Sequence, residues 1–127
     1  MRILLIEDDP FFQKFYTFKL REIGYEIYSA LDGIQGMEAV KKLRPDLILL
    51  DLIMPNKDGF GVLQDLASDP SLKTIPVLVF STLSQEADVA KAKALGAIDY
   101  VNKSFFDFDK LLQKIQAIIQ SAQKPAS

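Results

Sequence analysis

The chain has 127 residues, of which 49% are hydrophobic and 25% are charged, and this is the size and composition of one globular domain. Fifteen Lys and Arg residues against seventeen Asp and Glu residues give a formal net charge of -2, and no basic run could follow a phosphate backbone, so direct nucleic-acid binding is not expected. The absence of His and Cys excludes imidazole bases, thiolate nucleophiles, zinc fingers and disulfides. Any chemistry must therefore use carboxylates, hydroxyls, lysines or a bound ion.

Apolar runs along the chain are short, and none approaches the roughly 20 residues needed to cross a bilayer. The first run, Ile3 to Ile6, is followed at once by three acids, which is too short and too acidic for a signal peptide. We therefore expect no membrane contact and a cytoplasmic location. Residues 1–119 are expected to form one domain, with 120–127 as a C-terminal tail or the start of a linker, and both a stand-alone domain and a fragment of a longer protein remain open.

Short apolar runs alternate with stretches of helical periodicity, which predicts a parallel sheet with helices on both faces. In chain order, the predicted strands are 3–6, 25–29, 47–50, 77–80 and 98–101, and the predicted helices are 10–23, 33–43, 59–67, 84–95 and 107–119. The first, third and fourth strands are unbroken apolar runs, which is typical of central strands covered on both faces. Right-handed crossovers then favour the order 2-1-3-4-5, a flavodoxin-like (βα)5 doubly wound α/β fold.

The first predicted helix has clear end signals and an unusual composition. Asp9 and Pro10 are an N-cap and a first-turn proline, and Gly24 is expected to end the helix. The helix is rich in aromatic residues: Phe11, Phe12, Phe15, Tyr16 and Phe18. Core packing is the favoured interpretation, and an exposed docking face for a partner is the alternative.

Acidic residues gather where the strand order reverses, which is where ligands bind in open parallel sheets. Glu7, Asp8 and Asp9 follow the first strand, and Asp51 follows the third. Carboxylates this close raise one another's pKa unless a cation is present, and an oxygen-only ligand set selects a hard ion such as Mg²⁺. Asp9 is interpreted chiefly as the helix cap, whereas a lone Asp51 at the end of a buried strand would be costly without a function.

Two further polar residues follow the fourth and fifth predicted strands at the same edge of the sheet. These are Ser81 and Lys103, each of which taken singly is most often an ordinary turn or surface residue. No glycine-rich phosphate loop follows the first strand, so a phosphoryl group could bind at this acidic edge only with a metal ion and a positive side chain. Lys103 is placed to supply that charge, and Ser81 is placed to supply a hydroxyl.

These residues, in this order and at these spacings, resemble the receiver domain of bacterial two-component response regulators from Arg2 to about Ile119. The resemblance implies phosphoryl transfer from a histidine of a sensor kinase or phosphotransfer protein to Asp51. It also implies that Asp8, Asp51 and the backbone carbonyl of Ile53 bind Mg²⁺, for which Mn²⁺ can substitute, while Glu7 acts through water.

The resemblance further implies a signalling switch rather than an enzyme. Lys103 and Ser81 would contact the phosphoryl group, and Tyr100 would turn inward as Ser81 engages it. The surface formed by the fourth helix, fifth strand and fifth helix would then meet a downstream protein or a second copy. Two alternatives remain open at this point: a pseudo-receiver that binds partners without phosphorylation, and an aspartate-nucleophile phosphohydrolase, which would need an acid where the chain has Ile53.

Two departures from the family pattern, and the residues at two further family positions, lead to more expectations. The residue after Ser81 is Thr82, where the family usually has Ala or Gly, and this restricts the loop. In the family, the residues two positions after the phosphoacceptor and two after the Ser/Thr help to place the attacking water; here they are the apolar Ile53 and Leu83, so slow hydrolysis of the phosphorylated form is expected. The residue after Lys103 is Ser104 in place of the usual proline, so a trans peptide bond is expected there, because a cis bond without proline costs about 3–4 kcal/mol.

Overall fold

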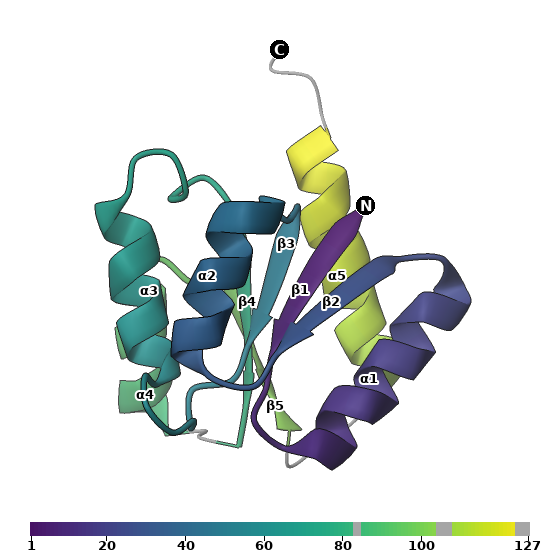
Figure 1. Cartoon of the computed structure of the whole chain (residues 1–127), viewed down its shortest axis with the longest axis horizontal. Helices are drawn as coiled ribbons and strands as arrows, with labels where there is room; N and C mark the ends of the chain where they lie inside the picture. The colour runs from purple at the N-terminus through teal and green to yellow at the C-terminus, as the bar shows by residue number, and fades with distance from the viewer. Residues whose placement is uncertain (83–84, 104–107, 124–127) are drawn as a thin grey trace.

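The structure is a computed structural model that describes residues 1–82, 85–103 and 108–123 (Figure 1). Strands and helices alternate along the chain, as the sequence predicts. Their bounds are β1 Arg2–Ile6, α1 Pro10–Ile23, β2 Glu26–Ala30, α2 Gly33–Leu43, β3 Leu47–Leu50, α3 Gly59–Ser68, β4 Val77–Ser81, α4 Glu86–Ala94, β5 Asp99–Asn102 and α5 Phe108–Gln123.

The five strands form one sheet in the order β2-β1-β3-β4-β5, and all four neighbouring pairs are parallel. The predicted strand order and the flavodoxin-like fold class are thereby confirmed. The three apolar runs occupy the centre, where β3 is buried along its whole length, and β2 and β5 are the edges. This order places the carboxyl ends of β1 and β3 next to each other, and that position is where the candidate site lies.

Two hydrophobic layers cover the sheet because alternate strand residues point to opposite faces. Leu4 and Ile6 of β1 pack with buried residues of α2, α3 and α4, whereas Ile3 and Leu5 pack with buried residues of α1 and α5. Figure 1 shows the same division, with α1 and α5 on one side of the sheet and the other three helices on the opposite side. Both faces of the central strands are therefore covered, which explains their uninterrupted apolar sequences.

Helix ends follow the capping signals in most places. The Asp9 side chain accepts hydrogen bonds from the backbone N–H groups of Phe11 and Phe12, at 2.8 and 3.4 Å, and Gly24 ends α1 with a left-handed φ of 113°. The expected bounds of α2 agree with the structure. Helix α4 is shorter than the predicted 84–95, and α5 continues to Gln123, beyond the predicted end at Ile119, because neither glycine nor proline interrupts it there.

The aromatic residues of α1 divide between the two interpretations. Tyr16 is buried and packs edge-on against Phe80 of β4, with ring centroids 4.9 Å apart. Phe11 and Phe18 are 72% and 62% exposed, so core packing explains only part of the set. In the part of the chain that the structure describes, no helix is both long enough and apolar enough to span a membrane.

Candidate functional site

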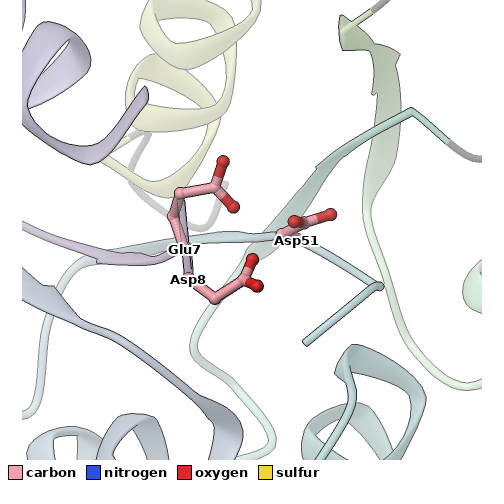
Figure 2. A group of neighbouring side chains, drawn as sticks. All are labelled: Glu7, Asp8 and Asp51. Carbon is pink, nitrogen blue, oxygen red and sulfur yellow. The ribbon is translucent and has the colours of Figure 1, made fainter. Parts of the chain in front are cut away.

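The candidate site is built on the backbone junction between β1, β2 and β3. The Glu7 N–H donates to the carbonyl of Ala30 at 3.0 Å, and the Asp51 N–H donates to the carbonyl of Ile6 at 3.1 Å. These bonds continue the sheet ladder past the last strand residues, so the acidic residues leave the sheet from a rigid edge. Figure 2 shows the Glu7, Asp8 and Asp51 side chains gathered at this edge.

Three carboxyl groups converge there. One oxygen from each of Glu7, Asp8 and Asp51 lies within 4.8 Å of the other two. Glu7 is 1% exposed and Asp51 is 8% exposed, while Asp8 is half-buried and so open to solvent on one side. The fourth acid of the predicted group, Asp9, caps α1 as described above. The expected convergence of side chains from two separate strands is therefore present, with Glu7, Asp8 and Asp51 as its members.

Lys103 supplies the positive charge of the site. Its ammonium group contacts a Glu7 carboxylate oxygen and lies 3.4 Å from Asp51 Oδ2. The side chain is buried, and its ammonium lies 5.0 Å from the ring centre of Phe12 and 5.4 Å from that of Phe80. These rings exclude water from one side of the ammonium and attract it electrostatically. Sequence reasoning placed Lys103 at this edge but gave no signal for the two aromatic neighbours or for the contact with Glu7.

Burial is the main reason that the pKa of Glu7 is raised to about 8, and the adjacent Asp51 carboxyl group raises it further. Lys103 acts in the opposite direction, but its attraction is not sufficient to restore the ordinary value. The sequence suggested the smaller of these two causes, the neighbouring acid, but not the burial of Glu7. A second positive charge placed among these oxygens would favour the ionised form of Glu7.

The donor set fits a hard divalent cation. All the converging groups are carboxylates, which are the side-chain ligands that Mg²⁺ prefers. The second oxygen of Glu7, Oε2, is buried and accepts no hydrogen bond from the described part of the chain. A buried acceptor without a donor is costly, and a water molecule held by a metal ion would supply that donor. When bound, Mg²⁺ would be held by Asp8 and Asp51 and would neutralise charge on a phosphoryl oxygen.

The loop between β3 and α3 completes this edge of the sheet. The Ile53 N–H donates to Asp51 Oδ1 at 3.3 Å, and the Gly59 N–H donates to the carbonyl of Leu52 at 3.1 Å. A Cβ atom on Gly59 would meet the backbone of Asp51 and would lie 2.7 Å from the Leu52 Cα, so only glycine allows this close return of the chain. The loop that carries Ile53 is therefore tightly folded against the end of β3.

Ser81 and Tyr100 lie on the two strands beyond β3. Ser81 is fully buried as the last residue of β4, and Tyr100 of β5 packs against the core under α2, α3 and α4. Burial raises the pKa of the Tyr100 hydroxyl, and its hydrogen bond with Ser81 opposes that shift. The pair that the sequence expected to be coupled is thus in direct contact. Two other expectations, on Leu83 and on the Lys103–Ser104 peptide bond, fall on positions outside the described residues.

Comparison with known proteins assigns the family. Residues 3–116 match the response regulator receiver domain, so the chain belongs to that family, whose members are signalling domains of two-component systems. The chain is 38% identical over 123 residues to the DNA-binding dual master transcriptional regulator RpaA of Synechocystis sp., covering 97% of this chain and 51% of RpaA. It is 33% identical over 118 residues to protein PilH of Pseudomonas aeruginosa, covering 93% of this chain and 97% of PilH.

Solved structures agree with this assignment. The signal receiver domain of a signal transduction histidine kinase from Syntrophus aciditrophicus superposes with a TM-score of 0.88 at 29% identity, covering 99% of this chain and 95% of that one. The Mn²⁺-bound form of response regulator Rcp1 superposes with a TM-score of 0.79 at 31% identity, covering 99% and 96%. The chain spans about half the length of RpaA and of related transcriptional regulators. The comparisons give no support to the pseudo-receiver or phosphohydrolase alternatives.

Proposed function

We propose that Asp51 accepts a phosphoryl group from a phosphohistidine of a sensor histidine kinase or phosphotransfer protein, in a reaction that requires Mg²⁺. The observation that carries this proposal is the arrangement around Asp51, whose carboxylate lies at a strand end beside two other acids and 3.4 Å from the Lys103 ammonium. In the transfer, the bond from phosphorus to the imidazole nitrogen breaks and a bond from phosphorus to an Asp51 oxygen forms. The protein is the acceptor in this reaction and assists its own phosphorylation.

The side chains around Asp51 have separate parts in this proposal. Asp8, Asp51 and the Ile53 carbonyl hold the metal ion, and Glu7 holds one of its water molecules. Lys103 neutralises a phosphoryl oxygen, because phosphoryl transfer spreads negative charge over three oxygens and needs cations and positioning more than a base. Mn²⁺ can replace Mg²⁺ because both are hard cations with oxygen ligands, and the Mn²⁺-bound Rcp1 structure supports this choice.

Ser81 and Tyr100 are proposed to report phosphorylation to the surface. Ser81 hydrogen-bonds the new phosphoryl group, which changes its bond with Tyr100 and shifts the packing of that ring. Helix α4 buries little of its surface against the core, because Ala92 is its one buried residue. The surface of α4, β5 and α5 is therefore where a downstream protein or a second copy would detect the change.

Labelling with a small phosphodonor tests the proposal. The protein incubated with acetyl phosphate and Mg²⁺ should gain the mass of one phosphoryl group, and chelation of the metal should prevent the gain. Asp51→Asn should abolish labelling. Asp46→Asn is a matched control, because Asp46 precedes the other end of β3 and accepts a hydrogen bond from the Arg2 N–H at 2.8 Å. Equal labelling of Asp51→Asn and the wild type would refute Asp51 as the acceptor.

A further inference from the structure

We infer that Asp32, which the site described above does not include, is a positioning residue for the metal-binding β3–α3 loop. The inference rests on the proposed metal site, in which the Ile53 carbonyl of that loop is a ligand. Asp32 precedes α2 and is only 7% exposed, although it carries a charge. Its carboxylate links the start of α2 to the loop, and through this link it is expected to set the affinity for the metal.

Both oxygens of the Asp32 carboxylate are engaged, each with a different element. Oδ1 accepts a hydrogen bond from the backbone N–H of Gln35 at 2.8 Å, which caps α2. Oδ2 accepts a hydrogen bond from the side-chain amide of Asn56 at 2.8 Å, across 24 positions of sequence. A single capping residue would need one oxygen only. The second bond has no part in the helix and is made to the loop that follows Asp51.

The loop conformation depends on this link. Asn56 has a left-handed φ of 68°, a backbone conformation that residues other than glycine adopt rarely and at a cost in energy. Asn tolerates this region better than most residues, and its amide bond to Asp32 holds it there. The next residue, Lys57, accepts a hydrogen bond through its carbonyl from the Gly33 N–H at 3.1 Å. Two hydrogen bonds, from Asn56 to Asp32 and from Gly33 to Lys57, therefore connect the turn at 56–57 to the start of α2.

Close packing at Gly33 reinforces this contact between α2 and the loop. A Cβ atom at Gly33 would lie 2.8 Å from the Lys57 Cβ and would also meet the Lys57 carbonyl. The absence of a side chain thus allows the loop to approach the start of α2. On the N-terminal side of Ile53, Leu52 is held by Gly59, whose N–H donates to the Leu52 carbonyl at 3.1 Å. Ile53 therefore lies between Leu52 and the turn at 56–57, while its own side chain is 51% exposed and adds little restraint.

Loss of the link should weaken metal binding without removing any ligand. Asp32→Ser keeps a good helix-capping hydroxyl but is too short to reach Asn56. Asn56→Gly keeps the left-handed turn and removes the amide donor. Residues that orient ligands directly are typically worth 10–100-fold in metal affinity, and Asp32 acts one step further away, so each variant should weaken Mn²⁺ binding about threefold to tenfold. Because both changes break the same bond, the double variant should bind about as weakly as either single variant.

The full chain is titrated with Mn²⁺, and the concentration of free Mn²⁺ is measured by electron paramagnetic resonance. The stability of each variant is measured in parallel by urea unfolding. Asp58→Ser is the matched control, because Asp58 caps α3 from the same loop by accepting a bond from the Gly61 N–H at 2.8 Å. It removes the same charge and keeps a capping hydroxyl, as Asp32→Ser does, but it leaves the link to α2 intact. The control should bind Mn²⁺ within about twofold of the wild type, even where its urea midpoint falls.

Each outcome of this titration decides the inference. Weaker binding by Asp32→Ser and Asn56→Gly, with non-additive effects and a normal Asp58→Ser, supports it. Wild-type affinity in both variants, or a loss equal to that in Asp58→Ser, overturns the inference and leaves the metal site intact. Absence of Mn²⁺ binding by the wild type overturns the metal site and this inference together. If Asp32→Ser does not fold, Asn56→Gly alone decides, because Asn56 is exposed and glycine suits its backbone.

Discussion

Replacement of Lys103 by Met should destabilise the metal-free protein by about 3 kcal/mol. The Lys103 ammonium lies 3.4 Å from Asp51 Oδ2, a separation at which two unit charges attract by about 5 kcal/mol when the effective dielectric constant is about 20. Methionine fills a similar volume and avoids the cost of burying an ammonium, and this saving offsets part of the lost attraction. The remaining loss agrees with the ~3–5 kcal/mol seen when one partner of a buried ion pair is removed.

Magnesium should reverse much of this loss. The ion would replace the missing positive charge among the three carboxylates, so Lys103→Met should gain more stability from saturating Mg²⁺ than the wild type gains. Urea unfolding followed by far-ultraviolet circular dichroism, with chelator and with Mg²⁺, measures both quantities. Lys57→Met is the matched control, because Lys57 pairs with Asp65 at a half-exposed site, where one ion pair is worth less than about 1 kcal/mol.

Two results would refute this reasoning. If Lys103→Met loses no more stability than Lys57→Met in the presence of chelator, the buried ammonium does not compensate the Glu7 and Asp51 carboxylates. If Mg²⁺ stabilises Lys103→Met no more than it stabilises the wild type, then the metal and the ammonium do not act on the same oxygens.

Two other changes test the structure away from Lys103. Gly59→Ala should destabilise the protein by about 1–3 kcal/mol in urea unfolding, because its Cβ would meet backbone atoms of Asp51 and Leu52 that cannot move aside, and wild-type stability would contradict the close approach. Asp99→Asn should lower stability by about 0.5 kcal/mol at neutral pH, since the half-exposed ion pair with Lys114 is largely screened. Partial burial acts to raise the pKa of Asp99, but the hydrogen bond from Lys114 acts to lower it, and the pKa is lowered overall. The stability that this ion pair contributes is therefore fully present above the pKa of Asp99 in the unfolded chain, and it disappears as the pH falls through the lower pKa of the folded protein. Thermal melts of the variant and the wild type should therefore converge once the pH has fallen below the lowered pKa of Asp99, and a constant difference would show that the loss is not electrostatic.

The sheet could be predicted from the sequence because its signals are local and strong. Apolar runs at 3–6, 47–50 and 77–80 identify the central strands, and the handedness of crossover connections then leaves few strand orders. The helix that begins at Pro10 and ends before Gly24 is equally legible. The ends of α4 are harder to predict, because Ala92 is its one buried residue and the segment has almost no apolar periodicity to mark where the helix begins or ends.

The site could be predicted as a set of residues but not as a set of contacts. The strand order alone brings the ends of β1 and β3 together, so the convergence of Glu7, Asp8 and Asp51 follows from topology. The pairing of Lys103 with Glu7 as well as Asp51 depends on side-chain conformations and burial that no spacing encodes. The link from Asp32 to Asn56 is similar, since an Asp before a helix indicates a cap and nothing local indicates a second partner 24 positions away.

The charge at this edge explains why the site should respond to both a metal and a phosphoryl group. Three carboxylates and one ammonium leave two negative charges when all are ionised, which is the charge that one divalent cation neutralises. Burial, together with the adjacent Asp51 carboxyl group, raises the pKa of Glu7 to about 8, so that a proton removes part of the repulsion. Phosphorylation of Asp51 would add negative oxygens beside Lys103, and the proposed bond of Ser81 to those oxygens would connect the new charge to β5 through the hydrogen bond between Ser81 and Tyr100. The repulsion among these carboxylates would therefore make the site sensitive to both a divalent cation and a phosphoryl group.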